Sequence, residues 1–425
     1  MLREKNRKFY IMRPNMKINL NTPRLILSAI ILLLLFITDS NTTLACTGIS
    51  LTAKDGSYIQ ARTIEWAHGV LPCSYVIIPR GERLTSLTPT GKTGATYCAK
   101  YGVVGLAVVQ KEFIAEGINE KGLSAGLFFF PSYGSYNSYS PALRGKTVVD
   151  LQFIQWILSQ FSTIDEVKAA VEEMRIVGLD PASVLHWRIG EPNGRQVVLE
   201  IVSGTPHFYE NRIGVLTNAP GFEWHITNLS NYVNLYQGDA PTQMLSKQTI
   251  RPLGGNSGFL GIPGDATPPS RFVRAAFYKA TAPVRETAFE AVQQCFHILN
   301  NFDIPIGIEL SASDVTGNLN SSSGSNTSDN NTALADRAGK ATDKSALNAA
   351  AAQYGVNTSN IYSVPSATQW TSAIDLTNLK VYYKTAYNNT IRCIDLHSID
   401  FKTVKYQSAP LDRKQVQPVE NVTIH

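Results

Sequence analysis

The sequence predicts an α+β fold in which stacked antiparallel sheets lie between layers of helices. Three observations support this prediction. The 425 residues are 44% hydrophobic and 17% charged, which is close to the average of globular domains. Hairpin signals recur along the chain, and two pairs of helical segments separate the groups of strands. The order of strands, two helices, strands, two helices and strands is typical of layers that bury their apolar faces against one another.

Three segments have the pattern of β-hairpins, in which two β-favouring stretches flank a turn rich in Gly, Asn, Asp or Lys. We expect each to form two neighbouring antiparallel strands. The segments are 49–63 with its turn at 54–57, 114–118 and 123–130 with the turn at 119–122, and 184–189 and 196–201 with the turn at 192–194.

Four segments carry helix signals, which are apolar residues at helical spacing or an N-terminal capping pattern. One of them begins with a capping box, because the Thr163 hydroxyl can accept from the main-chain N–H of Glu166 while the Glu166 carboxylate accepts in return. We expect two pairs of helices. The segments are 150–160, 163 to about 174, 270 to about 280, and 286 to about 299.

The first 45 residues have the pattern of a secretory signal peptide. Seven basic and two acidic side chains lie there, which accounts for the whole net charge of +5. The apolar run at 25–37 is shorter than the ~20 residues that a bilayer span needs, so an uncleaved anchor is the less favoured alternative. Residues 46–425 are formally neutral. We therefore expect export across the inner membrane to the periplasm or the exterior, no stable membrane span after processing, and no nucleic-acid partner.

The end of this leader predicts a cleavage site. Thr43 and Ala45 are small enough for the positions three before and one before a cleaved bond, which places cleavage between Ala45 and Cys46. Cys46 would then be the first residue of the mature protein. A lipoprotein signal also ends just before a cysteine, and an acylated α-amine could not act as a base.

We interpret residues 46–425 as a single domain with a low-complexity insertion at about 311–360. The insertion is rich in Asn, Ser, Thr and Ala and almost free of aromatic side chains. Such a segment buries too little apolar surface to offset the entropy of ordering. We expect it to be mobile, with one short helix near 346–352.

A cysteine that becomes residue one carries its own α-amine beside its thiol. The ordinary pKa of that amine is about 7.7 to 8.0, so it can accept a proton near neutral pH. N-terminal nucleophiles that use their own amine in this way cleave amide bonds. On position alone, however, Cys46 is equally well explained as a cysteine that happens to lie near a cleavage site.

Short fragments along residues 46–425 combine into one pattern. They are CTGIS (46–50) with ARTIEW (61–66), GINEKGL (117–123), VLTNAP (215–220) with WH (224–225) and NL (228–229), GIPGD (261–265) with PSRFVR (269–274), and TQWT (368–371). In this order they resemble the choloylglycine hydrolase family, which includes conjugated bile salt hydrolases and penicillin V acylases. The resemblance implies the four-layer αββα sandwich of N-terminal nucleophile hydrolases.

The resemblance also implies five catalytic positions. Cys46 matches the nucleophile, and Arg62 matches an arginine near its thiol, where a guanidinium should favour thiolate and depress the cysteine pKa. Asn218 matches the side chain that donates to the developing oxyanion. Arg271 matches a second arginine near the start of a helix, and Glu65 stands where the family usually has an aspartate that contacts the α-amine. Without the resemblance, Arg62 could be a surface ion pair and Asn218 part of an ordinary turn.

Aromatic residues crowd the segment 128–139, and we identify Phe128, Phe129 and Tyr133 as candidate substrate-binding residues. A place in the core of a sheet explains the two phenylalanines as well. Phe128 also replaces the asparagine or tyrosine usual in the family, although its main-chain N–H can still complete the oxyanion hole. The tyrosine lies in a Gly/Ser-rich loop, where a contact with an aromatic or steroid acyl group is plausible.

Other motifs are few. We find no His-x-x-x-His or Cys-x-x-Cys spacing, phosphate loop or dinucleotide fingerprint, so we expect neither a metal nor a cofactor. Cys73 and Cys98 either pair in an oxidising compartment or stay free. Cys295 and Cys393 are expected in the core.

The resemblance implies hydrolysis of a linear amide C–N bond on an apolar acyl or steroid body, with a small-molecule amide as substrate. Conjugated bile salts are favoured over penicillin V by a small margin, and acyl homoserine lactones come third. A homo-oligomer, either a dimer or a homotetramer, is implied as well. The alternative of a different class is a non-catalytic secreted lipoprotein or binding module with the same fold.

Overall fold

The computed structural model describes residues 45–66, 71–179, 184–305 and 367–424. All of them lie in one compact unit, Asp39–His425. The predicted leader, apart from Ala45, lies outside the described residues. So do the predicted insertion at 311–360 and the short helix near 346–352. The extent of the single domain and the signal peptide therefore stay predictions.

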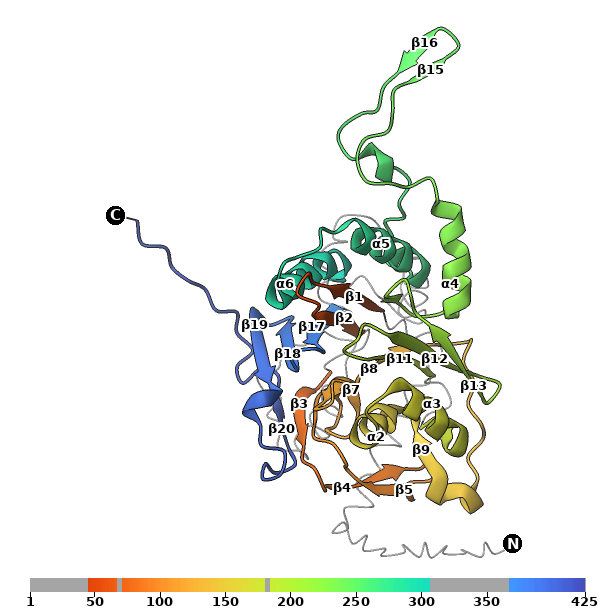
Figure 1. The fold of residues 1–425 in the computed structure, drawn as a ribbon, viewed down its shortest axis with the longest axis vertical. Coiled ribbons are helices and arrows are strands. Elements are labelled where there is room, and N and C mark those ends of the chain that lie inside the picture. Colours follow the sequence, from red (N-terminus) through yellow and green to blue (C-terminus); the bar gives the residue numbers. More distant parts are fainter. Residues whose placement is uncertain (1–44, 67–70, 180–183, 306–366, 425) are drawn as a thin grey trace, which may run out of the picture. The chain divides into compact units, whose positions relative to one another are not determined.

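Two antiparallel sheets lie against each other (Figure 1). The three predicted hairpins are confirmed and form the centres of both sheets. The six-stranded sheet has the order β14 (Val215–Leu216), β1 (Cys46–Thr52), β2 (Tyr58–Trp66), β17 (Ala367–Asp375), β18 (Lys380–Thr385) and β19 (Asn388–Asp395). The eight-stranded sheet has the order β13 (Thr205–Glu210), β12 (Gln196–Val202), β11 (Leu185–Gly190), β8 (Ser124–Phe129), β7 (Ile114–Asn119), β6 (Val103–Val108), β3 (Cys73–Ile78) and β20 (Gln407–Pro410).

Three two-stranded pairs and several short helical turns complete the described part. The pairs are β4 (Arg83–Leu87) with β5 (Thr93–Cys98), β9 (Thr147–Val149) with β10 (Arg175–Val177), and β15 (Gln243–Leu245) with β16 (Gln248–Ile250). The 3₁₀ turns are Pro141–Lys146, Asp150–Gln152, Leu229–Tyr232, Ser257–Phe259, Asn300–Phe302 and Leu396–Ser398.

Helices cover the outer face of each sheet. Helices α5 (Pro268–Thr281) and α6 (Ala288–Leu299) contact β1 of the six-stranded sheet. Helix α2 (Phe153–Gln160) contacts β7 and β8 of the eight-stranded sheet, and α3 (Ile164–Glu173) contacts β13. A further short helix, α4 (Phe222–Asn228), contacts α5. The order helices, sheet, sheet, helices confirms the predicted αββα sandwich.

The helix starts follow local signals. The capping box of Thr163 and Glu166 is present at the start of α3, as predicted. A second capping box, of Thr287 and Glu290, starts α6 two residues later than the predicted segment 286–299. The predicted helix at 150–160 begins as a 3₁₀ turn before α2.

The layer between the sheets contains buried polar side chains. From β2, Gln60 donates to the side-chain oxygen of Gln196 at 3.1 Å, and Arg62 donates to the carbonyl of Leu127. Burying such groups is costly unless they are hydrogen-bonded. The hydrogen bonds of these side chains therefore offset the cost of their burial.

The cysteines differ from expectation at one position. Cys295 is fully buried in α6, as expected, but Cys393 is exposed because it lies on β19, the edge strand of the six-stranded sheet. Cys73 and Cys98 are free thiols and form no disulfide.

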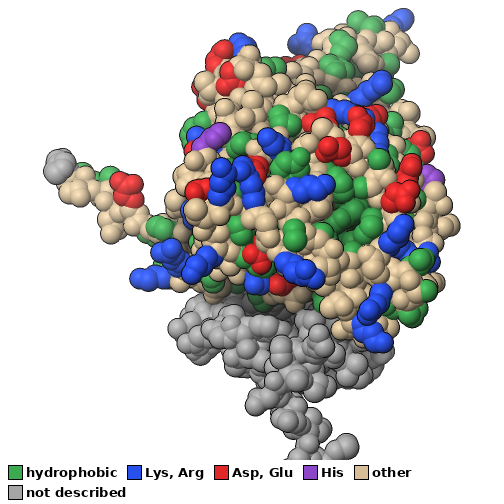
Figure 2. Space-filling model, turned by 60° about the horizontal axis from the view of Figure 1, so that its bottom comes forward, with side chains coloured by type: hydrophobic (Ala, Val, Ile, Leu, Met, Phe, Trp, Pro, Cys, Tyr) green, Lys and Arg blue, Asp and Glu red, His purple; other side chains and the backbone are tan. Residues whose placement is uncertain are grey.

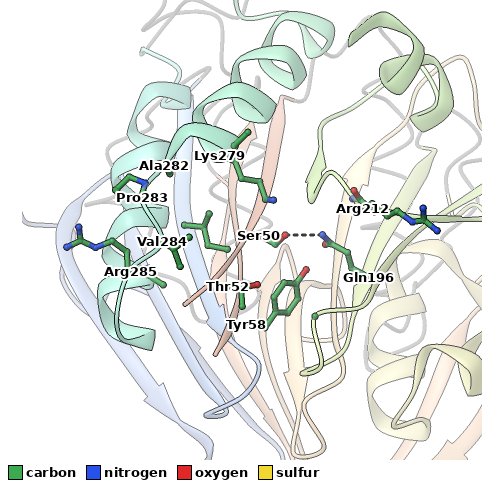
Figure 3. A pocket seen from close by; sticks show the side chains of 15 residues that line it. Ser50, Thr52, Tyr58, Gln196, Arg212, Lys279, Ala282, Pro283, Val284 and Arg285 are labelled. Atoms are coloured by element: carbon green, nitrogen blue, oxygen red, sulfur yellow. Dashed lines mark hydrogen bonds between the residues drawn. The ribbon is translucent and has the colours of Figure 1, made fainter. Parts of the chain in front are cut away.

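A cavity of about 410 Å³ lies at the C-terminal end of β1 (Figure 3). Its lining includes Ser50, Tyr58 and Lys279. Along the extended strand, this end of β1 is ~20 Å from Cys46. The cavity is therefore not the route by which a substrate would reach a group at the start of β1.

The surface carries both signs of charge. On the face drawn in Figure 2, Lys and Arg side chains are intermingled with Asp and Glu. Within the described ranges, no helix combines the length and apolar character that a membrane span needs.

Candidate active site

Cys46 is the first residue of β1 and only 3% of its surface is exposed. Strand pairing places Cys46 opposite Ile64 and Gly48 opposite Arg62 on β2. From there the Arg62 side chain reaches the thiol, with Nη2 at 2.7 Å from Sγ. The hairpin thus brings together a cation and a thiol that are sixteen residues apart in the sequence.

The Arg62 guanidinium is fixed by hydrogen bonds to main-chain carbonyls as well as by its contact with the thiol. Its Nε donates to the carbonyl of Thr63 at 3.0 Å, and Nη1 donates to the carbonyls of Ala115, at 3.3 Å, and Leu127. The side chain has no exposed surface. The alternative of a surface ion pair is therefore excluded for Arg62.

Asn218 follows β14, which pairs with β1. Its Oδ1 accepts from the main-chain nitrogen of Cys46 and from Nη2 of Arg271, both at 2.8 Å. Its Nδ2 donates to the carbonyl of Phe129 at 2.9 Å. These three contacts fix the amide, so that its nitrogen faces the end of β8.

Arg271 lies in the first turn of α5 and is buried. Its Nη1 donates to the carbonyl of Cys46 at 2.5 Å and to the hydroxyl of Thr47 at 2.8 Å. Together with its bond to Asn218, these contacts hold the first two residues of β1 in place.

Glu65 is buried near the end of β2. Its main-chain N–H donates to the carbonyl of Ala45 at 3.1 Å, and its carboxylate accepts from the hydroxyl of Thr368 at 3.0 Å. Its charge is close enough to Cys46 to raise the pKa of the thiol. The structure therefore gathers all five sequence-predicted catalytic residues in one buried cluster.

Burial makes the largest contribution to the pKa of the Cys46 thiol. It raises the pKa of Cys46 above its ordinary value and outweighs Arg62 and Arg271, whose charges lower it. Arg62 lowers this pKa, as expected, but the net shift is upward because burial contributes more. The net shift therefore favours the protonated thiol.

Among the described residues, no group of three or more His, Cys, Asp and Glu side chains could hold a metal ion. The functional cluster consists of one thiol, two arginines, one carboxylate and one amide.

The family model of linear amide C–N hydrolases, choloylglycine hydrolase family, matches residues 46–322. The chain belongs to this family. A bile salt hydrolase/transferase of Clostridium perfringens is 35% identical over 264 residues, which cover 60% of this chain and 78% of the relative. A conjugated bile acid hydrolase of Lactobacillus acidophilus is 28% identical over 270 residues, 60% of this chain and 81% of the relative.

Solved structures agree on the fold. Two variants of conjugated bile acid hydrolase from Clostridium perfringens match with a TM-score of 0.68 and 27% identity, covering 89% of this chain and 100% of theirs. One has a cysteine replaced by alanine, and the other has an arginine sixteen residues later replaced by leucine. Penicillin V acylase from Agrobacterium tumefaciens matches with a TM-score of 0.59 and 20% identity, covering 85% of this chain and 90% of that structure.

Membership of the family establishes the class of reaction. The protein is a hydrolase of linear amide C–N bonds with the N-terminal nucleophile hydrolase fold. In this chain, Cys46 and Arg62 are also sixteen residues apart, like the cysteine and arginine replaced in the two Clostridium perfringens variants.

The candidate substrate-binding aromatics have separate places. The Phe128 ring is fully buried between the sheets, where it packs against Gly48 and lies 4.4 Å from the Arg62 guanidinium. This is the core position that the sequence left open as an alternative. Phe129 is also buried, and its carbonyl faces Asn218. Tyr133 is 50% exposed at the surface.

Sequence reasoning missed a histidine that supports the Asn218 loop. His225 is buried on α4, stacks on Phe272 at 4.6 Å, and has Nε2 2.9 Å from the carbonyl of Asn218. Burial lowers its pKa to about 4, so the ring is neutral at neutral pH. Since a carbonyl only accepts, Nε2 carries the proton. The Trp224–His225 fragment of the family resemblance was the available signal.

Proposed function

We propose that cleavage before Cys46 creates an N-terminal nucleophile that hydrolyses the amide of conjugated bile salts, with penicillin V as the second candidate. The observation that carries this proposal is that Cys46 makes two contacts, one through its thiol and one through its main-chain nitrogen. The Cys46 thiol lies 2.7 Å from an Arg62 nitrogen, and the Cys46 main-chain nitrogen lies 2.8 Å from Asn218. Cleavage would convert that nitrogen into an amine beside the thiol.

Attack begins with a proton transfer. The free α-amine takes the thiol proton, and Arg62 stabilises the resulting thiolate. The sulfur then bonds to the amide carbonyl carbon. Phe129 accepts one of the two Nδ2 hydrogens of Asn218, so the other can be donated to the new oxyanion.

Loss of the amine and hydrolysis of the acyl thioester follow. The α-ammonium gives its proton to the leaving nitrogen, the C–N bond breaks, and an acyl thioester remains on Cys46. The amine next takes a proton from water, the hydroxide attacks the thioester, and the C–S bond breaks as the α-ammonium returns its proton to the leaving sulfur. The products are the free acid and the amine, and the thiol is restored.

The substrate assignment is supported by the relatives named as bile salt hydrolases. A hydrophobic pocket discriminates weakly, by about 1 to 3 kcal/mol per methylene, so some cross-reactivity is expected. The test is amine release by the processed protein from glycocholate, taurocholate, penicillin V and a long-chain acyl homoserine lactone. No release from any of the four would defeat the substrate assignment. Release from the acyl homoserine lactone alone would favour an acyl homoserine lactone acylase.

We also infer that residues 1–45 direct export to the periplasm or the exterior and are removed. The short apolar run and the small residues before Cys46 support this, as does a family match that begins at residue 46. Mass spectrometry of the exported protein tests it. A free Cys46 amine is expected, whereas a diacylglyceryl cysteine would favour the lipoprotein alternative.

Replacing Asn218 with alanine is expected to lower kcat by roughly 10²- to 10³-fold, because the oxyanion loses a side-chain donor. The matched control is Asn231→Ala, which removes an exposed amide from the turn after α4. Steady-state kinetics on the best substrate of the panel measures both variants, and circular dichroism confirms folding. An unchanged kcat in Asn218→Ala would contradict the assigned role.

We propose that the protein is a homo-oligomer assembled through the arm, residues 233–262. Figure 1 shows its two strands, β15 and β16, away from both sheets, and they pair only with each other among the described strands. The arm exposes Leu253 (96%) and Leu260 (83%) to solvent. Burial of such side chains in a partner would be favourable. Analytical ultracentrifugation of the parent protein is expected to show a dimer or tetramer. The double variant with Leu253→Glu and Leu260→Glu is expected to be a monomer. A monomeric parent protein would refute the proposal.

A further inference from the structure

A buried carboxylate lies behind the Arg62 guanidinium. Glu116 of β7 has no exposed surface, and its Oε2 is 4.0 Å from Arg62 Nη1. Oε2 has no hydrogen-bond partner among the described residues. A carboxylate at this distance is a potential partner for Arg62, because guanidinium and carboxylate form bidentate pairs when they can approach.

Glu116 is instead bound by a second arginine. Glu116, Gly126 and Arg188 occupy one row across β7, β8 and β11. Arg188 Nη2 donates to Glu116 Oε1 at 2.8 Å. A side chain at Gly126 would block this contact, since its Cβ would lie 2.0 Å from Glu116 Oε2. The glycine therefore leaves the space in which the carboxylate meets Arg188.

Arg188 is itself anchored in the opposite sheet. Its Nη1 donates to the carbonyls of Ile49 and Ala61, both at 3.1 Å. These two residues face each other on β1 and β2. The guanidinium thus cannot move far from Glu116 without breaking contacts that join the two sheets.

We propose that Arg188 is a positioning residue: by binding one oxygen of Glu116, it prevents that carboxylate from drawing the Arg62 guanidinium away from the Cys46 thiol. Arg62 then keeps Nη2 on Sγ. The inference rests on the proposed function only in taking Cys46 as the nucleophile.

The charges of this cluster support the inference. Arg62, Arg188 and Glu116 are all buried, with at most 1% of each side chain exposed. Burial raises the pKa of the Glu116 carboxyl and the charges of Arg188 and Arg62 lower it, so an ionised Glu116 depends on these two cations. Because Arg188 binds Glu116, the charge of Arg62 remains available to a thiolate formed at Cys46, on which the charges of Arg271 and Glu65 also act. Removing Arg188 alone would leave Glu116 with Arg62 as its remaining cation, and the thiolate would lose its partner.

The test measures the reactivity of Cys46 directly. The pH dependence of alkylation by iodoacetamide is followed at the Cys46 peptide by mass spectrometry, with the exposed thiol of Cys98 as internal reference. We expect Arg188→Met to move the Cys46 midpoint upward by about one pH unit, in the range typical of a lost ion partner. We expect Glu116→Gln to move it downward, because the competing charge is gone. The double variant should return it towards the parent value.

The matched control is Arg195→Met, which removes a surface arginine from the turn between β11 and β12 and should leave the midpoint unchanged. The charges that shift the Cys46 pKa directly are those of Arg62, Glu65 and Arg271, so opposite shifts and their cancellation on changing Arg188 and Glu116 indicate an effect through the position of Arg62. A merely structural role predicts shifts of the same sign and a double variant worse than either single one, and that result would overturn the proposal. If Arg188→Met does not fold, the downward shift in Glu116→Gln decides. Because alkylation needs no substrate, a failed substrate panel leaves this test intact.

Discussion

Replacing Cys46 with alanine is expected to abolish amine release, a loss of about 10⁴-fold or more in kcat, because the sulfur that accepts the acyl group is gone. The fold should persist. Cys46 is the first residue of β1, and the strand pairing with β2 depends on main-chain contacts that alanine keeps. Product formation by mass spectrometry measures the loss.

The matched control is Cys295→Ala, which removes a sulfur from an equally buried cysteine in α6. It should lower thermal stability through a small cavity while leaving kcat near the parent value. If Cys46→Ala kept turnover within tenfold of the parent, the nucleophile would have to be sought elsewhere. If Cys295→Ala lost as much activity, the effect at Cys46 would be one of folding.

Local signals in the sequence predicted the centre of the fold. The turns of the three hairpins and the capping box at Thr163 act through nearest neighbours, so they can be recognised without knowledge of the rest. The second capping box, at Thr287 and Glu290, has the same form and could have been found. The strands β15 and β16 could not be predicted in this way. Every one of their residues is exposed, and their sequences lack the alternation of apolar and polar side chains that indicates a strand.

The candidate site was predictable only in part. The family fragments identified Cys46, Arg62 and Asn218, but not the burial that raises the thiol pKa, which depends on the packing of two sheets. Glu116 and Arg188 lie 72 residues apart, so their contact has no local signature. A weaker signal did exist, since each is a charged residue within a strand that is otherwise suited to burial.

A chain that keeps Ala45 is expected to be inactive, with a kcat at least 10²- to 10⁴-fold below that of a chain beginning at Cys46, the range attributed to a general base. In the uncleaved chain, the Cys46 nitrogen is a peptide N–H that donates to Asn218. Its lone pair is delocalised into the carbonyl of Ala45, so it cannot take a proton from the thiol. The raised pKa of that thiol makes the missing base more costly still.

Two otherwise identical proteins separate this effect from folding. One is released from a cleavable fusion so that it begins at Cys46, and the other retains Ala45, with intact mass confirming each terminus. Their strand pairing should be the same, because the chain without Ala45 lacks only the hydrogen bond that the Glu65 main-chain N–H donates to the Ala45 carbonyl. Equal turnover by the two proteins would show that the α-amine is not the base. The proton of Cys46 would then have to pass to another group, and the buried carboxylate of Glu65, whose charge acts on the thiol, is the first candidate.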